Sequence, residues 1–231
     1  MAEHVAGSKR THEYELGHTD RELKRLGTQA QLVDPMTRQF FRNAGLAAGM
    51  RVLDIGSGAG DVAFLAAELV GAAGEVVGTD RSETALTSAR RRAMERSLSN
   101  VSFRDGDPTM LTFDRPFDAV VGRYVLMFSP DPAAMLRGIA RHLRPGGTVV
   151  FHEADWRGAR SFPPAPTYDL CCDWIVKTFR KVGTSTQMGL SLHSAFLSAG
   201  LNAPTMGLQA LVGGGSNSLS GLDLIADLAV P

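Results

Sequence analysis

The stretch RVLDIGSGAGDVAFLAA, residues 51–67, places three alternating glycines directly after an apolar run. The run at 51–55 predicts a buried strand, and the apolar pattern at 61–70 predicts a helix. Glycines between a strand and a helix allow a tight turn and let a ligand approach the main chain closely. The stretch therefore predicts a nucleotide-like ligand at a strand–helix turn.

The spacing of these glycines differs from that of phosphate-binding loops. In the dinucleotide pattern G-x-G-x-x-G the third glycine follows the second by three positions, whereas Gly60 follows Gly58 by two. Asp61 stands at the expected helix start, where its carboxylate would repel a pyrophosphate. The Lys-Ser/Thr pair of a P-loop is also missing after the glycines. Both kinds of phosphate-binding loop are therefore disfavoured.

Strand-like and helical patterns alternate along the following hundred residues. Apolar runs predict strands at 51–55, 75–79, 101–104, 117–121 and 147–152, and helical patterns lie at 61–70, 83–96 and 132–143. Such alternation predicts an α/β fold with a doubly wound, mostly parallel sheet and helices on both faces.

Helical patterns also precede this region. Thr19 and Glu22 have the spacing of a capping box, which predicts a helix up to about Val33. Asp34-Pro35 then predicts the start of a second helix that ends at Gly45. We expect residues 1–48 to form a helical cap on a domain that spans residues 49–231.

The pattern changes after residue 156. A proline-rich loop is followed by a helix through Trp174 and Phe179 and by a second helix at about 187–199. We interpret residues 156–200 as a helical insertion at an acceptor site. Residues 204–212 predict a sixth strand, and an amphipathic pattern at 221–231 predicts a short helix.

Composition restricts the classes of partner. Lys and Arg together number 24, as do Asp and Glu, so the net charge is zero and favours neither nucleic acid nor an anionic membrane. No apolar run approaches the ~18 residues of a membrane span. Cys171 and Cys172 are adjacent, so we expect them to be reduced, to bind no metal and to indicate a cytoplasmic protein.

Acidic residues follow the next two predicted strands. Asp80 ends the second strand, where a carboxylate can accept the hydroxyls of a ribose. Asp107 follows the third strand, in FRDGDPTM, and LRPGG precedes the fifth. Together with the glycine stretch, this ordered set of motifs resembles the class I S-adenosylmethionine-dependent methyltransferases, over about residues 50–156.

The resemblance implies a Rossmann-like methyltransferase that binds S-adenosylmethionine and releases S-adenosylhomocysteine. Asp54 and the glycines match the first motif, Asp80 the ribose ligand, Arg81 an adenine neighbour and Asp107 the acceptor for the adenine amine. The implied and candidate cofactor-binding residues are Asp54, Gly56, Ser57, Gly58, Gly60, Asp80, Arg81, Gly106, Asp107, Pro108, Arg123 and Tyr124, with Arg25 and Gln29 from the cap. The Asn/Asp-Pro-Pro-Tyr/Phe motif of amino-methylating DNA and protein enzymes is absent, so the expected acceptor is a small molecule whose O, N or C atom is methylated.

Candidate catalytic residues are His152, Glu153 and Arg123. His152 and Glu153 end the fifth predicted strand and point to opposite faces. We favour His152 as the base, because the pKa of an ordinary histidine lies near neutrality. Arg123 suits either an anionic acceptor or the cofactor carboxylate.

Two other functions stay open from the sequence. One is a cofactor-binding subunit or sensor without catalysis, and the other, which Asp61 disfavours, is a dinucleotide-dependent oxidoreductase. The family sheet normally has a seventh strand, for which the sequence offers no candidate. We therefore expect either a truncated chain or a partner chain, as in a homodimer, that covers the open sheet edge.

Overall fold

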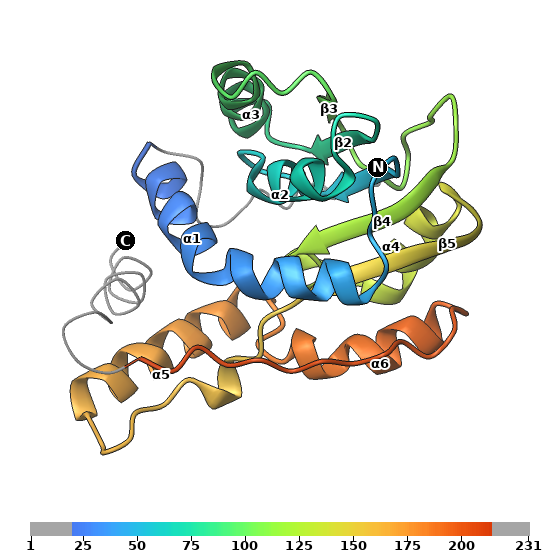
Figure 1. Ribbon diagram of the computed structural model, residues 1–231. Coiled ribbons are helices and arrows are strands. Elements are labelled where there is room, and N and C mark those ends of the chain that lie inside the picture. Colours follow the sequence, from blue (N-terminus) through green and yellow to red (C-terminus); the bar gives the residue numbers. More distant parts are fainter. Residues whose placement is uncertain (1–19, 214–231) are drawn as a thin grey trace, which may run out of the picture.

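A parallel sheet of five strands forms the centre of the molecule (Figure 1). The computed structural model describes residues 20–213, and their side chains from Arg25 onward. The strand order is β3-β2-β1-β4-β5 and every pair is parallel. The strands are β1 (Arg51–Ile55), β2 (Glu75–Asp80), β3 (Val101–Asp105), β4 (Phe117–Arg123) and β5 (Leu143–His152). The doubly wound α/β fold is confirmed.

The helices follow the predicted pattern closely after the first strand. They are α2 (Asp61–Val70), α3 (Glu83–Glu95), α4 (Pro132–Ala140), α5 (Pro166–Lys181) and α6 (Met188–Ser198), with short 3₁₀ helices η1 (Leu126–Phe128) and η2 (Trp156–Gly158). Ser82 caps α3 by accepting the Ala85 N–H at 3.3 Å, and Asp131 caps α4 by accepting the Ala134 N–H at 2.8 Å. The residues LRPGG, expected to stop a helix, instead open β5, because α4 already ends at Ala140.

The prediction of two separate N-terminal helices is wrong. One helix, α1 (Asp20–Asn43), runs through Pro35. Proline removes one helical N–H and bends a helix, and Figure 1 shows α1 changing direction along its length. Pro35 is exposed, so water can solvate the carbonyl that loses its partner. The expected capping box at Thr19 and Glu22 lies outside the described side chains.

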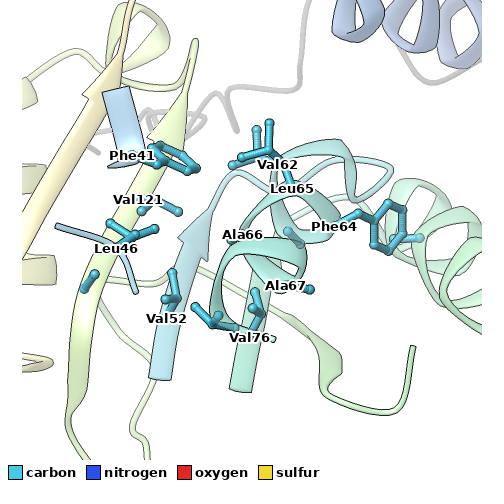
Figure 2. Close-up of a cluster of buried hydrophobic side chains, with 14 of the residues drawn as sticks. Phe41, Leu46, Val52, Val62, Phe64, Leu65, Ala66, Ala67, Val76 and Val121 are labelled. Atoms are coloured by element: carbon cyan, nitrogen blue, oxygen red, sulfur yellow. The ribbon is translucent and has the colours of Figure 1, made fainter. Parts of the chain in front are cut away.

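Alternate residues of each central strand pack on opposite faces of the sheet. Val52, Val76 and Val121 belong to one buried cluster, which α2, α3 and Phe41 of α1 complete (Figure 2). Their neighbours Leu53, Val77 and Val120 belong to a second cluster with α4, α5 and α6. Because all five residues of β1 are buried, this strand has no solvent-facing side. Helices therefore cover both faces of the sheet, as predicted.

The predicted sixth strand is also wrong. Residues 201–213 have no strand hydrogen bonds, and most of their side chains are exposed. The segment passes α1, since a Cβ built on Gly207 would lie 3.2 Å from Cε1 of Phe40. Alternating polar and apolar residues suit an extended backbone, but a strand also requires a neighbour to pair with. In the described part of the chain, β5 is an edge strand paired only with β4, and the predicted C-terminal helix lies outside it.

Other sequence-based expectations concern cysteines and membranes. Cys171 and Cys172 are both free thiols. Within residues 20–213, no helix combines the length and the apolar character that crossing a bilayer demands.

Candidate functional site

The predicted site residues gather around a cleft at the carboxyl ends of the strands. Its lining includes the loops after four strands and the end of the fifth: Gly56, Ser57, Gly58, Asp80, Arg81, Gly106, Pro108, Arg123, Tyr124, His152 and Glu153. In parallel sheets this edge binds ligands at the point where the strand order reverses. Here that point is β1, which lies between β2 and β4.

In the loop after β1, Gly58 and Gly60 are required for different reasons. Gly58 has φ +52°, and a Cβ built on it would meet no atom within 4 Å, so its main chain faces open space in the cleft. Gly60 has φ +94°, but its Cβ would lie 2.7 Å from Cζ of Phe64. Gly60 therefore serves close packing of α2, whereas Gly58 leaves room for a ligand.

Asp80 connects this loop to the tip of β2. Its carboxylate accepts the Gly58 N–H at 2.8 Å and the Ser82 N–H at 2.9 Å. The side chain thus lies beside the open face of Gly58 and lines the cleft. Asp61 opens α2 as expected, and its carboxylate pairs with Arg92 at 2.6 Å.

Two polar side chains at the base of the loop lack hydrogen-bond partners. Both carboxylate oxygens of Asp54 and the Ser57 hydroxyl are buried and accept no hydrogen bond from the described residues. Burial raises the pKa of Asp54 well above its ordinary value, against the opposing charge of Arg123. Ser57 lines the cleft, whereas Asp54 lies beneath it. An unpaired buried hydroxyl next to an open glycine fits a polar ligand.

The third predicted ligand, Asp107, is held by its own loop. Its carboxylate accepts the Thr109 N–H at 2.8 Å and the Thr109 hydroxyl at 2.7 Å, and it also pairs with Arg81. Burial favours a higher pKa, but the hydrogen bonds from Thr109 and the Arg81 guanidinium outweigh it and lower the pKa of Asp107. Asp107 is not part of the cleft lining, whereas its neighbours Gly106 and Pro108 are.

A buried polar network joins α1 to the ends of β4 and β5. Arg123 donates to the Asp34 carboxylate at 2.6 Å and to the Thr37 hydroxyl at 3.0 Å. The Thr37 hydroxyl lies 2.9 Å from Nδ1 of His152 and 3.0 Å from the Val33 carbonyl. Residues more than a hundred positions apart therefore meet at the candidate base.

His152 is neutral at ordinary pH. Burial and the Arg123 charge lower its pKa to about 4. Its ring packs against Phe40, with centroids 5.0 Å apart, and against Tyr124, at 5.3 Å. A neutral imidazole carries a hydrogen on one ring nitrogen only, so its other nitrogen can accept a proton.

Glu153 has a different environment from its neighbour. Its carboxylate accepts the N–H groups of Val125, Leu126 and Met127 at 2.9, 2.8 and 3.3 Å. Burial raises its pKa to about 7. This side chain therefore anchors the segment after β4, which begins with Tyr124 at φ +56°.

The cap helix contributes both predicted and unpredicted residues. Arg25 and Gln29 share a helix face as expected, since the Arg25 guanidinium donates to Oε1 of Gln29 at 2.9 Å, and both line the cleft. The roles of Asp34 and Thr37 in the network were not predicted from the sequence. Thr37 is fully buried, and the available signal was a hydroxyl on the apolar stripe formed by Ala30, Val33 and Phe41.

Comparison with known proteins assigns the family. A family model described as a methyltransferase domain matches residues 46–182, more than half of the chain. The chain belongs to the methyltransferase domain family. An S-adenosylmethionine-dependent methyltransferase from Aquifex aeolicus has the same fold, with a TM-score of 0.58 and 20% identity over 79% of this chain and 89% of that one.

Two curated members of the family are similar in sequence. Aklanonic acid methyltransferase of Streptomyces sp. (strain C5) is 38% identical over 62% of this chain and 64% of its own length. Demethylmenaquinone methyltransferase of Lactococcus lactis subsp. lactis (strain IL1403) is 37% identical over 52% of this chain and 46% of its own. The chain thus spans less than two thirds of the length of either relative.

Membership of this methyltransferase family implies S-adenosylmethionine as the cofactor. The residues present fit such a ligand, because the open main chain at Gly58, the unpaired hydroxyl of Ser57 and the Asp80 carboxylate adjoin one another in the cleft. The cofactor carries no phosphate, which agrees with a carboxylate at the start of α2.

Proposed function

We propose that the protein transfers a methyl group from S-adenosylmethionine to a small-molecule acceptor. The observation that carries the proposal is the position of the buried, neutral His152 on the same cleft as the glycine loop. When bound, S-adenosylmethionine supplies a methyl group on a sulfonium, which an aligned nucleophile can displace in line.

On this proposal, Gly58, Ser57 and Asp80 hold the cofactor at the β1 and β2 tips. Arg25 and Gln29, which line the cleft from α1, hold its methionine end. Arg81 keeps Asp107 and the loop with Gly106 and Pro108 in place through the ion pair. Because α1 covers one side of the cleft, it also excludes water from the reacting atoms.

The acceptor is an apolar, ring-containing molecule with an acidic hydrogen. Large apolar side chains line the cleft, namely Met36, Phe40, Tyr124, Met127, Trp156 and Phe179, and two of them, Phe40 and Tyr124, contact the His152 ring. The named substrates of similar proteins include an acid and a naphthoquinone. His152 takes the acceptor hydrogen at Nε2, and the Arg123 charge stabilises the anion that results. The pKa of about 4 is well below the near-neutral value for which His152 was favoured from the sequence, so His152 is a weak base. A weak base requires an acceptor with an acidic hydrogen, such as an enol or a phenol.

The proposal extends to the location of the protein in the cell, its domain boundaries and its oligomeric state. The free thiols of Cys171 and Cys172 favour a cytoplasmic location. We assign residues 1–48 to a cap and 156–200 to the acceptor side of the domain. Among residues 20–213 β5 pairs only with β4, and an open strand edge favours a homodimer, which sedimentation velocity tests directly.

The first experiment is calorimetric titration of the protein with S-adenosylmethionine, S-adenosylhomocysteine and NAD. Binding of the first two alone, lost in Asp80→Ala and kept in Asp131→Ala, supports the proposed cofactor site. Asp131 is the matched control because it also accepts a backbone N–H but lies outside the cleft. Binding of NAD, or equal binding by both variants, would overturn the proposal.

A further inference from the structure

Thr37 makes three polar contacts, and each contact restricts its chemistry. The hydroxyl oxygen lies 3.0 Å from the Val33 carbonyl, 3.0 Å from an Arg123 nitrogen and 2.9 Å from Nδ1 of His152. Thr37 is fully buried, so no bulk water replaces any of these partners.

The three contacts are compatible with one arrangement of hydrogens. A carbonyl only accepts, so the single hydroxyl hydrogen of Thr37 goes to Val33. A guanidinium only donates, so Arg123 uses one lone pair of the hydroxyl oxygen. The remaining lone pair faces His152, whose Nδ1 must then carry a hydrogen and donate it.

We propose that Thr37 is a positioning residue that fixes the tautomer of His152, with the hydrogen on Nδ1 and the lone pair on Nε2. This inference rests on the proposed function for its catalytic consequence, because Nε2 is then free to accept a hydrogen from the acceptor. The opposite tautomer would present an Nε2–H to the cleft and could only donate.

The surroundings of His152 favour the same assignment. Arg123 is the cation beside the imidazole, and Asp34 holds that cation on the side of α1. Phe40 and Tyr124 pack against the ring and leave Thr37 as the polar partner of Nδ1 among the described residues. The cap helix therefore does more than cover the cleft, since its Thr37 sets which ring nitrogen of His152 carries the hydrogen.

The test compares Thr37→Val, which has nearly the same shape, with Thr37→Ser, which keeps the hydroxyl. Nitrogen-15 NMR of the intact protein reads the tautomer without cofactor or acceptor, and His152→Phe identifies the signals. We expect protonated Nδ1 and unprotonated Nε2 in the wild type and in Thr37→Ser. In Thr37→Val we expect a mixture of tautomers. A wild-type signal from protonated Nε2, or an unchanged tautomer in Thr37→Val, would overturn the proposal.

Kinetics provide the second readout. We expect Thr37→Val to lower kcat with the methyl acceptor by roughly 10- to 100-fold, part of what acid–base catalysis contributes, and Thr37→Ser to stay within about twofold. Ser194→Ala is the matched control, because its hydroxyl also bonds back to a helix carbonyl, at 2.9 Å, outside the cleft. Equal kcat in Thr37→Val and wild type would overturn the positioning role. If the wild type shows the expected tautomer by NMR but methylates none of the acceptors tried, the proposed function is refuted and the tautomer assignment stands.

Discussion

The buried, neutral state of His152 makes a quantitative prediction about stability and pH. Its pKa in the folded protein is about 4, against 6.5 in an unfolded chain. Between these values the unfolded state binds a proton that the folded state excludes, so stability falls as the pH falls. One pKa unit corresponds to about 1.36 kcal/mol. Lowering the pH from 7.5 to 4.5 should therefore reduce the contribution of His152 to the free energy of unfolding by about 2.5 kcal/mol.

The assay compares wild type with His152→Phe, which keeps an aromatic ring against Phe40 and Tyr124. Urea unfolding followed by circular dichroism gives the free energy of unfolding of both proteins at several pH values. Glu153, with its pKa raised to about 7, has the opposite effect, since its protonation stabilises the folded state below that pH. Both proteins contain Glu153, so its contribution cancels in the difference. Between pH 7.5 and 4.5, the free energy of unfolding should fall by about 2.5 kcal/mol more in the wild type than in His152→Phe. A difference that stays constant with pH would refute the reasoning.

Other substitutions test other parts of the structure. Gly58→Ala forces a side chain into φ +52° and into the open space of the cleft, so we expect a loss of about 1–2 kcal/mol of stability and weaker S-adenosylmethionine binding by calorimetry. Gly49→Ala is the matched control, because Gly49 also has a positive φ (+84°) and open space around it but lies outside the cleft lining; equal affinity in both variants would contradict the assignment. Leu136→Ala removes a fully buried side chain from the second cluster and should cost about 2–5 kcal/mol in urea unfolding; a cost near zero would argue against that core. Glu153→Gln removes the charge that binds three backbone N–H groups, so the backbone amides of residues 125–127 should exchange with solvent faster. Unchanged amide exchange would show that this carboxylate does not anchor the segment.

Much of the fold could be predicted because its signals are local. Strand β1 and helix α2 have the predicted bounds, since an apolar run, a glycine turn and an amphipathic pattern follow one another directly. Ser82 and Asp131, directly before the predicted helical patterns at 83–96 and 132–143, cap α3 and α4. Each of these features depends on residues only a few positions apart.

The errors concern interactions over long distances in the chain. Pro35 was expected to begin a helix, yet packing of α1 against α2 and β5 favours a continuous bent helix. The segment at 204–212 has the alternation of a strand but pairs with no strand in the described chain. Thr37 gave no sign of its contact with His152, 115 positions later. A pattern of residue types shows which backbone a segment prefers, but not which partner it meets.

The separation between Thr37 and His152 has a consequence for synthesis on the ribosome. The cap helix is translated before β4 and β5, with Val33, Thr37 and Phe41 on the stripe that later becomes buried. The hydrogen-bond partners of Thr37 on β4 and β5, Arg123 and His152, are translated 86 and 115 residues afterwards. At roughly 5–20 residues per second, the Thr37 hydroxyl waits about 5–20 seconds for these two partners. A newly made chain therefore contains the cap helix, with the Thr37 hydroxyl still without Arg123 and His152, well before the cleft is complete.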